Sequence, residues 1–93
     1  MAGTEDHHLL LYKYVDDVLE RRGPYREAHL ARLASERERG RVLMAGALGD
    51  PPSGAAFVFR GVEPAAIEEF VRGDPYVEAG LVTSWQIEPW RLV

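Results

Sequence analysis

The fold is decided by residues 42–59, VLMAGALGDPPSGAAFVF, where two apolar runs flank a cluster of turn residues. Residues 49–54, GDPPSG, carry the strongest turn signal in the chain, because glycine, proline, aspartate and serine each favour tight turns. The runs on either side, Val42 to Leu48 and Ala55 to Phe59, have the length of strands. This stretch therefore predicts two antiparallel strands joined as a hairpin.

A helix is predicted on each side of the hairpin. Upstream, Pro24 suits the first helical position and Gly40 the position after the last turn, which predicts a helix from Pro24 to about Arg39. Downstream, Pro64 opens a second helix whose apolar residues lie on one face, namely Ile67, Phe70 and Val71.

Two further apolar runs predict the outer strands, Leu9 to Val15 and Leu81 to Glu88. A short helical turn is expected between Asp16 and Arg22, closed by Gly23. The order strand, helix, strand, strand, helix, strand predicts an α+β domain of βαββαβ type.

Length and composition set the class. Ninety-three residues make one domain, expected at residues 9–93 behind a flexible tail at residues 1–8, although His7 and His8 could instead begin the first strand. The net charge of −4 does not suggest a nucleic-acid partner. No apolar run approaches the roughly 20 residues that cross a bilayer, and no signal peptide is evident, so we expect a cytoplasmic protein with no membrane partner.

Neither a metal nor a cofactor is expected. The absence of cysteine excludes disulfides and thiolate metal sites. His7 and His8 would point to opposite faces of a strand, with no obvious third ligand. There is also no glycine-rich phosphate loop.

The first three strands are apolar at both alternating sets of positions. On the second strand, for example, Val42 and Met44 would share one face, and Leu43 and Ala45 the other. Since two helices can cover only one face of a four-stranded sheet, we expect the other face to pack against a second copy, giving a homodimer. Trp85 and Trp90 would add contact area if either reaches the partner. The alternative is that small and aromatic side chains simply face water there.

His29 is the first candidate for chemistry. On a helical wheel Leu30, Leu33 and Ala34 mark the buried stripe of its helix, Arg26 falls in the same sector, and His29 lies at the edge beside Leu33. An imidazole at that margin can face a cleft and exchange a proton near neutral pH. The alternative is a structural histidine that binds a backbone carbonyl.

Asp74 is the second candidate, in the turn Gly73-Asp74-Pro75-Tyr76. Its structural interpretation is an N-cap followed by proline at the first position of a turn. Its functional interpretation is a carboxylate that orients a histidine ring and fixes its tautomer, with Tyr76 as an aromatic wall. Either interpretation fits the local sequence.

Together these motifs resemble a known family. Residues 26–33, REAHLARL, resemble the R-x-x-H-L-x-x-L helix of YciI-like (YCII-related) proteins, and Asp74-Pro75-Tyr76 resembles their D-P-[FY] motif. Met44-Ala45-Gly46-Ala47 is similar to the small-residue stretch of their second strand. The resemblance implies a ferredoxin-like domain related to the dimeric α+β barrels, with His29 and Asp74 as an active-site pair and Arg26 and Tyr76 as neighbours. The family contains a dehydrochlorinase that acts on a chlorinated hydroxyhydroquinone, and most members have no assigned reaction.

The same topology occurs in RNA-recognition domains, whose third strand carries aromatic residues that stack on bases. Residues 53–60, SGAAFVFR, lack the leading basic residue and two of those aromatics, which argues against RNA binding.

The sequence therefore favours a cofactor-independent enzyme of lyase or isomerase type acting on a small organic molecule. In this hypothesis His29 is the general acid/base, Asp74 orients it, and Arg26 binds an anionic group of the substrate. The alternative is a non-catalytic ligand-binding or assembly protein in which the His-Asp pair is structural.

Overall fold

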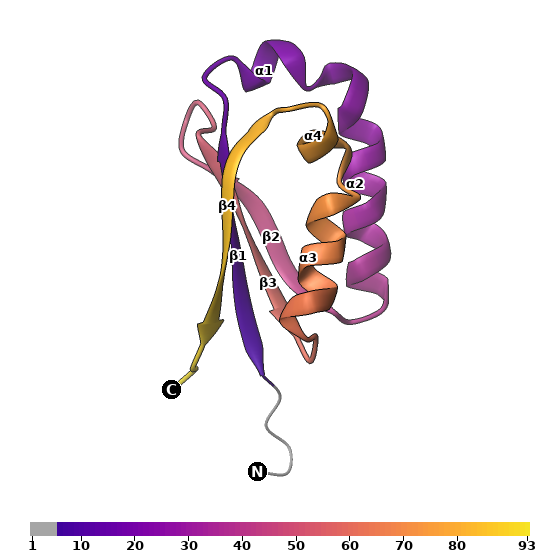
Figure 1. Ribbon diagram of the computed structural model, residues 1–93, viewed down its shortest axis with the longest axis vertical. Coiled ribbons are helices and arrows are strands. Elements are labelled where there is room, and N and C mark those ends of the chain that lie inside the picture. The colour runs from indigo at the N-terminus through magenta and orange to yellow at the C-terminus, as the bar shows by residue number, and fades with distance from the viewer. Residues whose placement is uncertain (1–5) are drawn as a thin grey trace.

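A computed structural model describes residues 6–93, which form one sheet and four helices (Figure 1). Of the tail predicted at residues 1–8, residues 1–5 lie outside the described residues. The elements, in chain order, are β1 (His7–Tyr14), α1 (Val18–Arg21), α2 (Gly23–Glu38), β2 (Val42–Leu48), β3 (Gly54–Arg60), α3 (Pro64–Arg72), α4 (Pro75–Glu78) and β4 (Val82–Trp90).

The four strands pair in the order β2-β3-β1-β4, and every pairing is antiparallel. The helices lie on one side of this sheet (Figure 1). The predicted α+β class and βαββαβ order are confirmed. The short helical turn expected between Asp16 and Arg22 is α1, and α4 is a second short helix, which begins at Pro75. Within residues 6–93, no helix is long and apolar enough to cross a membrane.

Strand and helix boundaries follow the predicted signals closely. Val42–Leu48 is a strand as predicted, and α3 begins at Pro64 and buries Ile67, Phe70 and Val71. Strand β1 begins at His7, so the two histidines belong to the strand rather than to a tail.

Strand β2 corrects one prediction about faces. Val42 pairs with Phe59 and Met44 pairs with Val58, so Leu43 is an extra residue in a bulge. Because the bulge shifts the alternation by one residue, Val42 and Ala45 face the core while Met44 is 62% exposed. The prediction that Val42 and Met44 share a face was therefore wrong.

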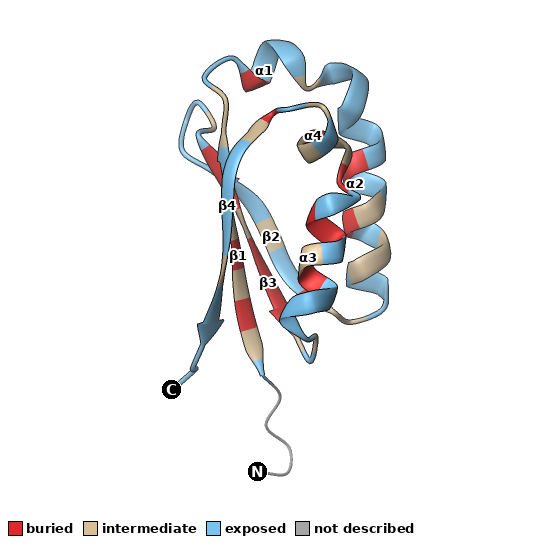
Figure 2. Cartoon of the chain, in the orientation of Figure 1, coloured by how far each residue is buried: buried red, intermediate tan, exposed pale blue. Residues whose placement is uncertain are grey.

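The buried stripe of α2 also differs from the prediction. His29 and Leu33 are the buried residues of this helix, whereas Leu30 is 42% exposed and Ala34 is exposed as well. The helix is rotated so that His29 lies at the centre of its buried face instead of at the margin. Figure 2 shows this face turned toward the sheet and α3.

The core lies between the sheet and the helices (Figure 2). Leu10 and Tyr12 of β1 and Phe57 and Phe59 of β3 are at most 3% exposed, and they pack against residues of α2 and α3. A smaller cluster of Val18, Tyr76 and Leu81 closes the end of the core near α1 and α4.

The opposite side of the sheet, here called the open face, has no helix over it (Figure 1). From the strand pairing, its apolar side chains are Leu9, Leu11, Met44, Leu48, Ala56 and Val58. Met44 and Leu48 are exposed, and Leu9, Leu11 and Ala56 are half-buried. Trp90 pairs with His7 and so lies on this side, whereas Trp85 pairs with Tyr12 and lies on the helix side.

Candidate active site

The backbone brings His29 and Asp74 together from opposite sides of the core. His29 lies in the second turn of α2 and faces the sheet. Asp74 lies between α3 and α4, where Pro75 starts α4 and the Asp74 carboxylate accepts a hydrogen bond from the Tyr76 backbone N–H at 3.0 Å. The predicted N-cap is thus present, and it holds the carboxylate in place for a second contact.

That second contact is with the imidazole. His29 Nδ1 lies 2.8 Å from Asp74 Oδ1, and the two residues are 5% and 1% exposed. A carboxylate can only accept, so His29 Nδ1–H is the donor. The predicted proximity of His29 and Asp74 is confirmed, and it is a direct hydrogen bond.

Aromatic rings enclose the imidazole. The Tyr76 ring stacks on it with centroids 3.9 Å apart and planes 3° from parallel, and the Phe57 ring meets it edge-on at 6.4 Å. Tyr76, predicted as a neighbour, is therefore in direct contact with His29. Its backbone N–H orients Asp74 while its ring covers one face of the imidazole.

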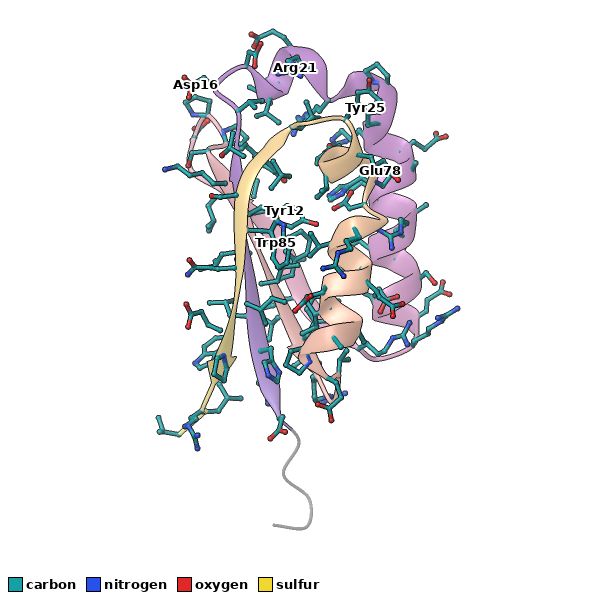
Figure 3. The ribbon with its side chains drawn as sticks, viewed as in Figure 1. Tyr12, Asp16, Arg21, Tyr25, Glu78 and Trp85 are labelled. Carbon is teal, nitrogen blue, oxygen red and sulfur yellow. The ribbon has the colours of Figure 1, made fainter. Side chains whose placement is uncertain are left out.

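Tyr12 is a member of the site that sequence analysis missed. Its hydroxyl donates to Asp74 Oδ2 at 2.7 Å, and the residue is 3% exposed (Figure 3). The sequence showed only an aromatic residue in an apolar strand, which is the usual composition of a core. The one usable signal was that a buried tyrosine hydroxyl needs a partner, and Asp74 is a strong acceptor.

Arg26 lies on the exposed surface of α2 and acts on the Tyr76 hydroxyl. Burial raises the pKa of Tyr76, and the positive charges of Arg22 and Arg26 oppose that rise. Arg26 also contributes as a hydrogen-bond partner of this hydroxyl. The two arginines thus place positive charge beside the outer edge of Tyr76, with Arg22 not foreseen from the sequence.

The neighbouring tyrosines are strongly perturbed. Burial raises the pKa of Tyr14 to about 12, and the nearby Tyr76 and Asp74 add to the rise while Arg22 opposes it. Burial also raises the pKa of Tyr12, reinforced by the charge and hydrogen bond of Asp74. Both hydroxyls therefore stay protonated at neutral pH.

Within residues 6–93, no group of three or more histidine, aspartate or glutamate residues is arranged to hold a metal ion. His7 and His8 alternate across β1, and His8 is buried with its Nδ1 lacking a hydrogen-bond partner.

Two hollows lie on the surface of the molecule. One, of about 350 Å³, has its lining centred on β1 and includes Tyr12, together with residues such as Leu11, Lys13 and Gln86. The other, of about 230 Å³, lies between α2 and α3 and includes Arg32 and Arg41. Neither of these two hollows is lined by His29.

The chain is similar to known proteins in sequence and in fold. The YCII-related domain matches residues 7–91. Protein YciI from Escherichia coli is 34% identical over 88 residues, covering 83% of this chain and 88% of the relative. An uncharacterised protein from Haemophilus influenzae is 32% identical over 98 residues, covering 94% of this chain and 98% of the relative.

Among solved structures, 5-chloro-2-hydroxyhydroquinone dehydrochlorinase from Burkholderia phenoliruptrix, in complex with 2,5-dihydroxybenzoquinone, has a TM-score of 0.79 at 22% identity. The match covers 94% of this chain and 95% of that one. A putative antibiotic biosynthesis monooxygenase from Bacteroides thetaiotaomicron has a TM-score of 0.59 at 15% identity, covering 100% and 93% of the two chains. These two likenesses show that the chain has the ferredoxin-like fold.

The domain match spans nearly the whole chain and includes both the helix that carries His29 and the turn that carries Asp74. With curated relatives above 30% identity over most of their length, the resemblance suggested by those two motifs is confirmed, and the chain belongs to the YCII-related domain family.

Proposed function

We propose that this protein is a cofactor-independent enzyme of lyase or isomerase type that acts on a small organic molecule. His29 is its general acid/base and Asp74 orients the ring. The observation that carries the proposal is the buried, directly hydrogen-bonded His29–Asp74 pair, which leaves the second ring nitrogen uncommitted. A protein core of this size gains little from burying two titratable groups that do no chemistry.

The reactive atom in this proposal is His29 Nε2. With the proton on Nδ1, Nε2 carries the lone pair that can accept a proton from a substrate and return it later. Nε2 makes no hydrogen bond with any of residues 6–93. The His29 side chain is 7% exposed, so the ring is almost, but not completely, buried.

Arg26 and Tyr76 supply the substrate-binding side of the proposal. The Arg26 guanidinium is exposed, and within residues 6–93 it has no carboxylate partner, so its charge is available to an anionic ligand. A phenolate or carboxylate on a planar ring fits this charge and the aromatic wall of Tyr76. The complex of the structurally similar dehydrochlorinase with 2,5-dihydroxybenzoquinone supports a ligand of this kind.

Binding of 2,5-dihydroxybenzoquinone tests the proposal directly. Titration should shift the ring signals of His29 in NMR spectra of the wild type, and Arg26→Gln should weaken binding about tenfold or more. The matched control is Glu27→Gln, an exposed neighbour on the same helix, which should bind like the wild type. Equal binding by the wild type and Arg26→Gln would remove Arg26 from the site.

Turnover is tested by chloride release from 5-chloro-2-hydroxyhydroquinone and by solvent-proton exchange into a panel of small phenols and keto acids. His29→Gln should reduce any activity found by about 100-fold or more, since a general acid/base contributes about 10²–10⁴. Activity that survives His29→Gln unchanged would exclude His29 as the acid/base.

The competing proposal is a non-catalytic ligand-binding or assembly protein in which the pair is structural. The observation in its favour is that the His29 ring is packed between Tyr76 and Phe57 and that neither hollow reaches it. Modification by diethyl pyrocarbonate, located by peptide mass spectrometry, separates the two. An enzyme should be modified at His29 and protected by ligand, whereas a structural His29 should react only when the protein unfolds.

We further propose that the protein is a homodimer formed through the open face. Its apolar residues, from β1, β2 and β3, lie on the side of the sheet that no helix covers, and burying them in a second copy is favourable. Analytical ultracentrifugation should give about twice the 10.4 kDa of one chain, and Leu11→Lys should give the monomer. Leu30→Lys, which places the same charge on α2, is the control and should remain dimeric. A wild-type monomer at micromolar concentration would refute the dimer.

A further inference from the structure

The carboxylate of Asp74 is held by three donors from three different elements. Tyr12 of β1 donates its hydroxyl, His29 of α2 donates Nδ1–H, and Tyr76 of α4 donates its backbone N–H. Asp74 is 1% exposed, so water contributes almost nothing to satisfying it. The orientation of this carboxylate is therefore decided entirely by the protein.

The two oxygens of Asp74 have different partners. Oδ1 accepts from His29 at 2.8 Å and from the Tyr76 N–H at 3.0 Å, whereas Oδ2 accepts from Tyr12 at 2.7 Å. The last torsion of an aspartate side chain is broad, so contacts at one oxygen do not fix the plane of the carboxylate. A short hydrogen bond at the second oxygen, Oδ2, fixes that plane.

Tyr12 is itself rigidly placed. It lies on the central strand β1, paired with Ala55 on one side and Trp85 on the other. Its ring meets Phe57 edge-on with centroids 4.8 Å apart. Gly54 lets β3 approach closely here, because a Cβ at that position would collide with the Tyr12 carbonyl oxygen.

The Tyr12 hydroxyl also remains a donor at neutral pH. Burial raises the pKa of Tyr12, and the adjacent negative charge of Asp74 raises it further, so the hydroxyl keeps its proton there. A hydroxyl that keeps its proton can hold Asp74 in the same orientation during a proton transfer at His29.

We propose that Tyr12 is the positioning residue of this site: its hydroxyl holds Asp74 Oδ2, which turns Oδ1 toward His29 Nδ1 and keeps the neutral imidazole in the tautomer whose lone pair is on Nε2. Tyr12 acts through Asp74 and does not touch the substrate. The inference rests on the proposed function for its catalytic consequence, but the tautomer can be measured without any substrate.

The test is Tyr12→Phe, which keeps the ring and removes the hydroxyl. Tyr14→Phe is the matched control, since Tyr14 lies on the same strand and its hydroxyl makes no hydrogen bond with residues 6–93. Ring ¹⁵N NMR of neutral His29 distinguishes a nitrogen that carries a proton from one that does not. The wild type and Tyr14→Phe should show one tautomer, protonated at Nδ1, and Tyr12→Phe should show a mixture of both.

Kinetics provide the second measurement. With any substrate that the wild type converts, Tyr12→Phe should lower kcat about 10- to 100-fold while KM stays within about twofold, the pattern expected when a partner behind a reactive group is lost. Tyr14→Phe should keep the wild-type kcat.

The outcomes separate this inference from the proposed function. A single Nδ1-protonated tautomer of His29 in folded Tyr12→Phe overturns the inference. A mixture of His29 tautomers in the wild type also overturns it, and this measurement does not depend on any variant folding. In another outcome, the wild type binds and converts no compound, His29 of the wild type is a single tautomer, and His29 of Tyr12→Phe is a mixture. That outcome refutes the proposed function and leaves the role of Tyr12 intact.

Discussion

The helix side and the open face of the sheet are built from alternate residues of the same strands, yet they differ in what they bury. On the helix side, Leu10 and Tyr12 are at most 3% exposed, and a polar cluster of Tyr12, His29 and Asp74 sits inside the core with short hydrogen bonds. On the open face, Leu9 and Leu11 are only half-buried, and Met44 is 62% exposed.

The difference shows that hydrophobicity alone does not decide what is buried in this protein. Polar groups lie in the core because each finds a specific partner, and apolar groups remain exposed because nothing in one chain covers them. On the helix side, the buried polar groups of this cluster thus have hydrogen-bond partners within the chain. The open face has the exposed apolar side chains that are typical of an interface. The following predictions test that contrast, from the largest expected effect to the smallest.

The largest effect is expected from Asp74→Ala. This change leaves the Tyr12 hydroxyl, the His29 ring and the Tyr76 N–H without their acceptor inside the core. Breaking such a buried network should lower the free energy of unfolding by about 3–5 kcal/mol in urea denaturation. Asp16→Ala, an exposed aspartate at the start of the β1–α1 turn (Figure 3), should stay within about 0.5 kcal/mol of the wild type. A cost below about 1 kcal/mol for Asp74→Ala would mean that the cluster adds little to stability.

The second prediction compares neighbouring leucines on opposite faces. Leu10→Ala should cost about 2–5 kcal/mol at any protein concentration, because it leaves a cavity in a fully buried site. In the proposed homodimer the second copy covers Leu11, so the cost of Leu11→Ala should depend on protein concentration. Urea unfolding over a hundredfold range of concentration measures both. Equal and concentration-independent costs would show that the two faces do not differ in this way.

The third prediction concerns alkaline pH. The pKa of Tyr14 rises from 10.0 to about 12 in the folded protein, so the folded state retains a proton that the unfolded state loses between these values. The resulting stability is fully present below about pH 10 and is lost as the pH rises to about 12. Tyr14→Phe should show a smaller fall in unfolding free energy across this range. The difference in absorbance at 295 nm between the two proteins should report a tyrosinate forming near pH 12.

The smallest effect is expected for nucleic acids. The aromatic residues of β3, Phe57 and Phe59, are each 1% exposed on the helix side, while the open face of that strand presents Gly54, Ala56 and Val58. No aromatic residue of β3 is therefore available to stack on bases. Fluorescence polarisation with a single-stranded RNA at low salt should stay flat, and micromolar binding that weakens with added salt would contradict this.

Local signals in the sequence were sufficient for most of the fold. Proline at the start of α2, α3 and α4, glycine after α2, and the turn between β2 and β3 each restrict the backbone by themselves. The motifs around His29 and Asp74 also identified the two residues that meet. The turns and caps were predictable because they depend on residues close together in the chain, whereas the pairing of His29 with Asp74, 45 residues away, came from the family resemblance.

The wrong predictions concern residues whose exposure is decided by tertiary packing and not by the local pattern of apolar residues. Leu43 looks like any strand residue, and only its pairing with β3 makes it a bulge. Leu30 is apolar and exposed whereas His29 is polar and buried, because the rotation of α2 is set by the hydrogen bond of His29 to Asp74 and its stacking on Tyr76. A helical wheel takes neither of these two contacts into account.

The sequence by itself thus determined the order of elements, since turn residues and caps act over a few positions, and the resemblance of its motifs to a family pointed to the pair His29 and Asp74, which are 45 residues apart. Only the tertiary structure decided that Tyr12 completes the hold on Asp74 from 62 residues away, that the open face is uncovered, and that Arg22 joins Arg26 beside Tyr76. The physical reason is that a hydrogen bond between distant residues depends on how strands and helices pack. No local pattern of residues encodes that distance.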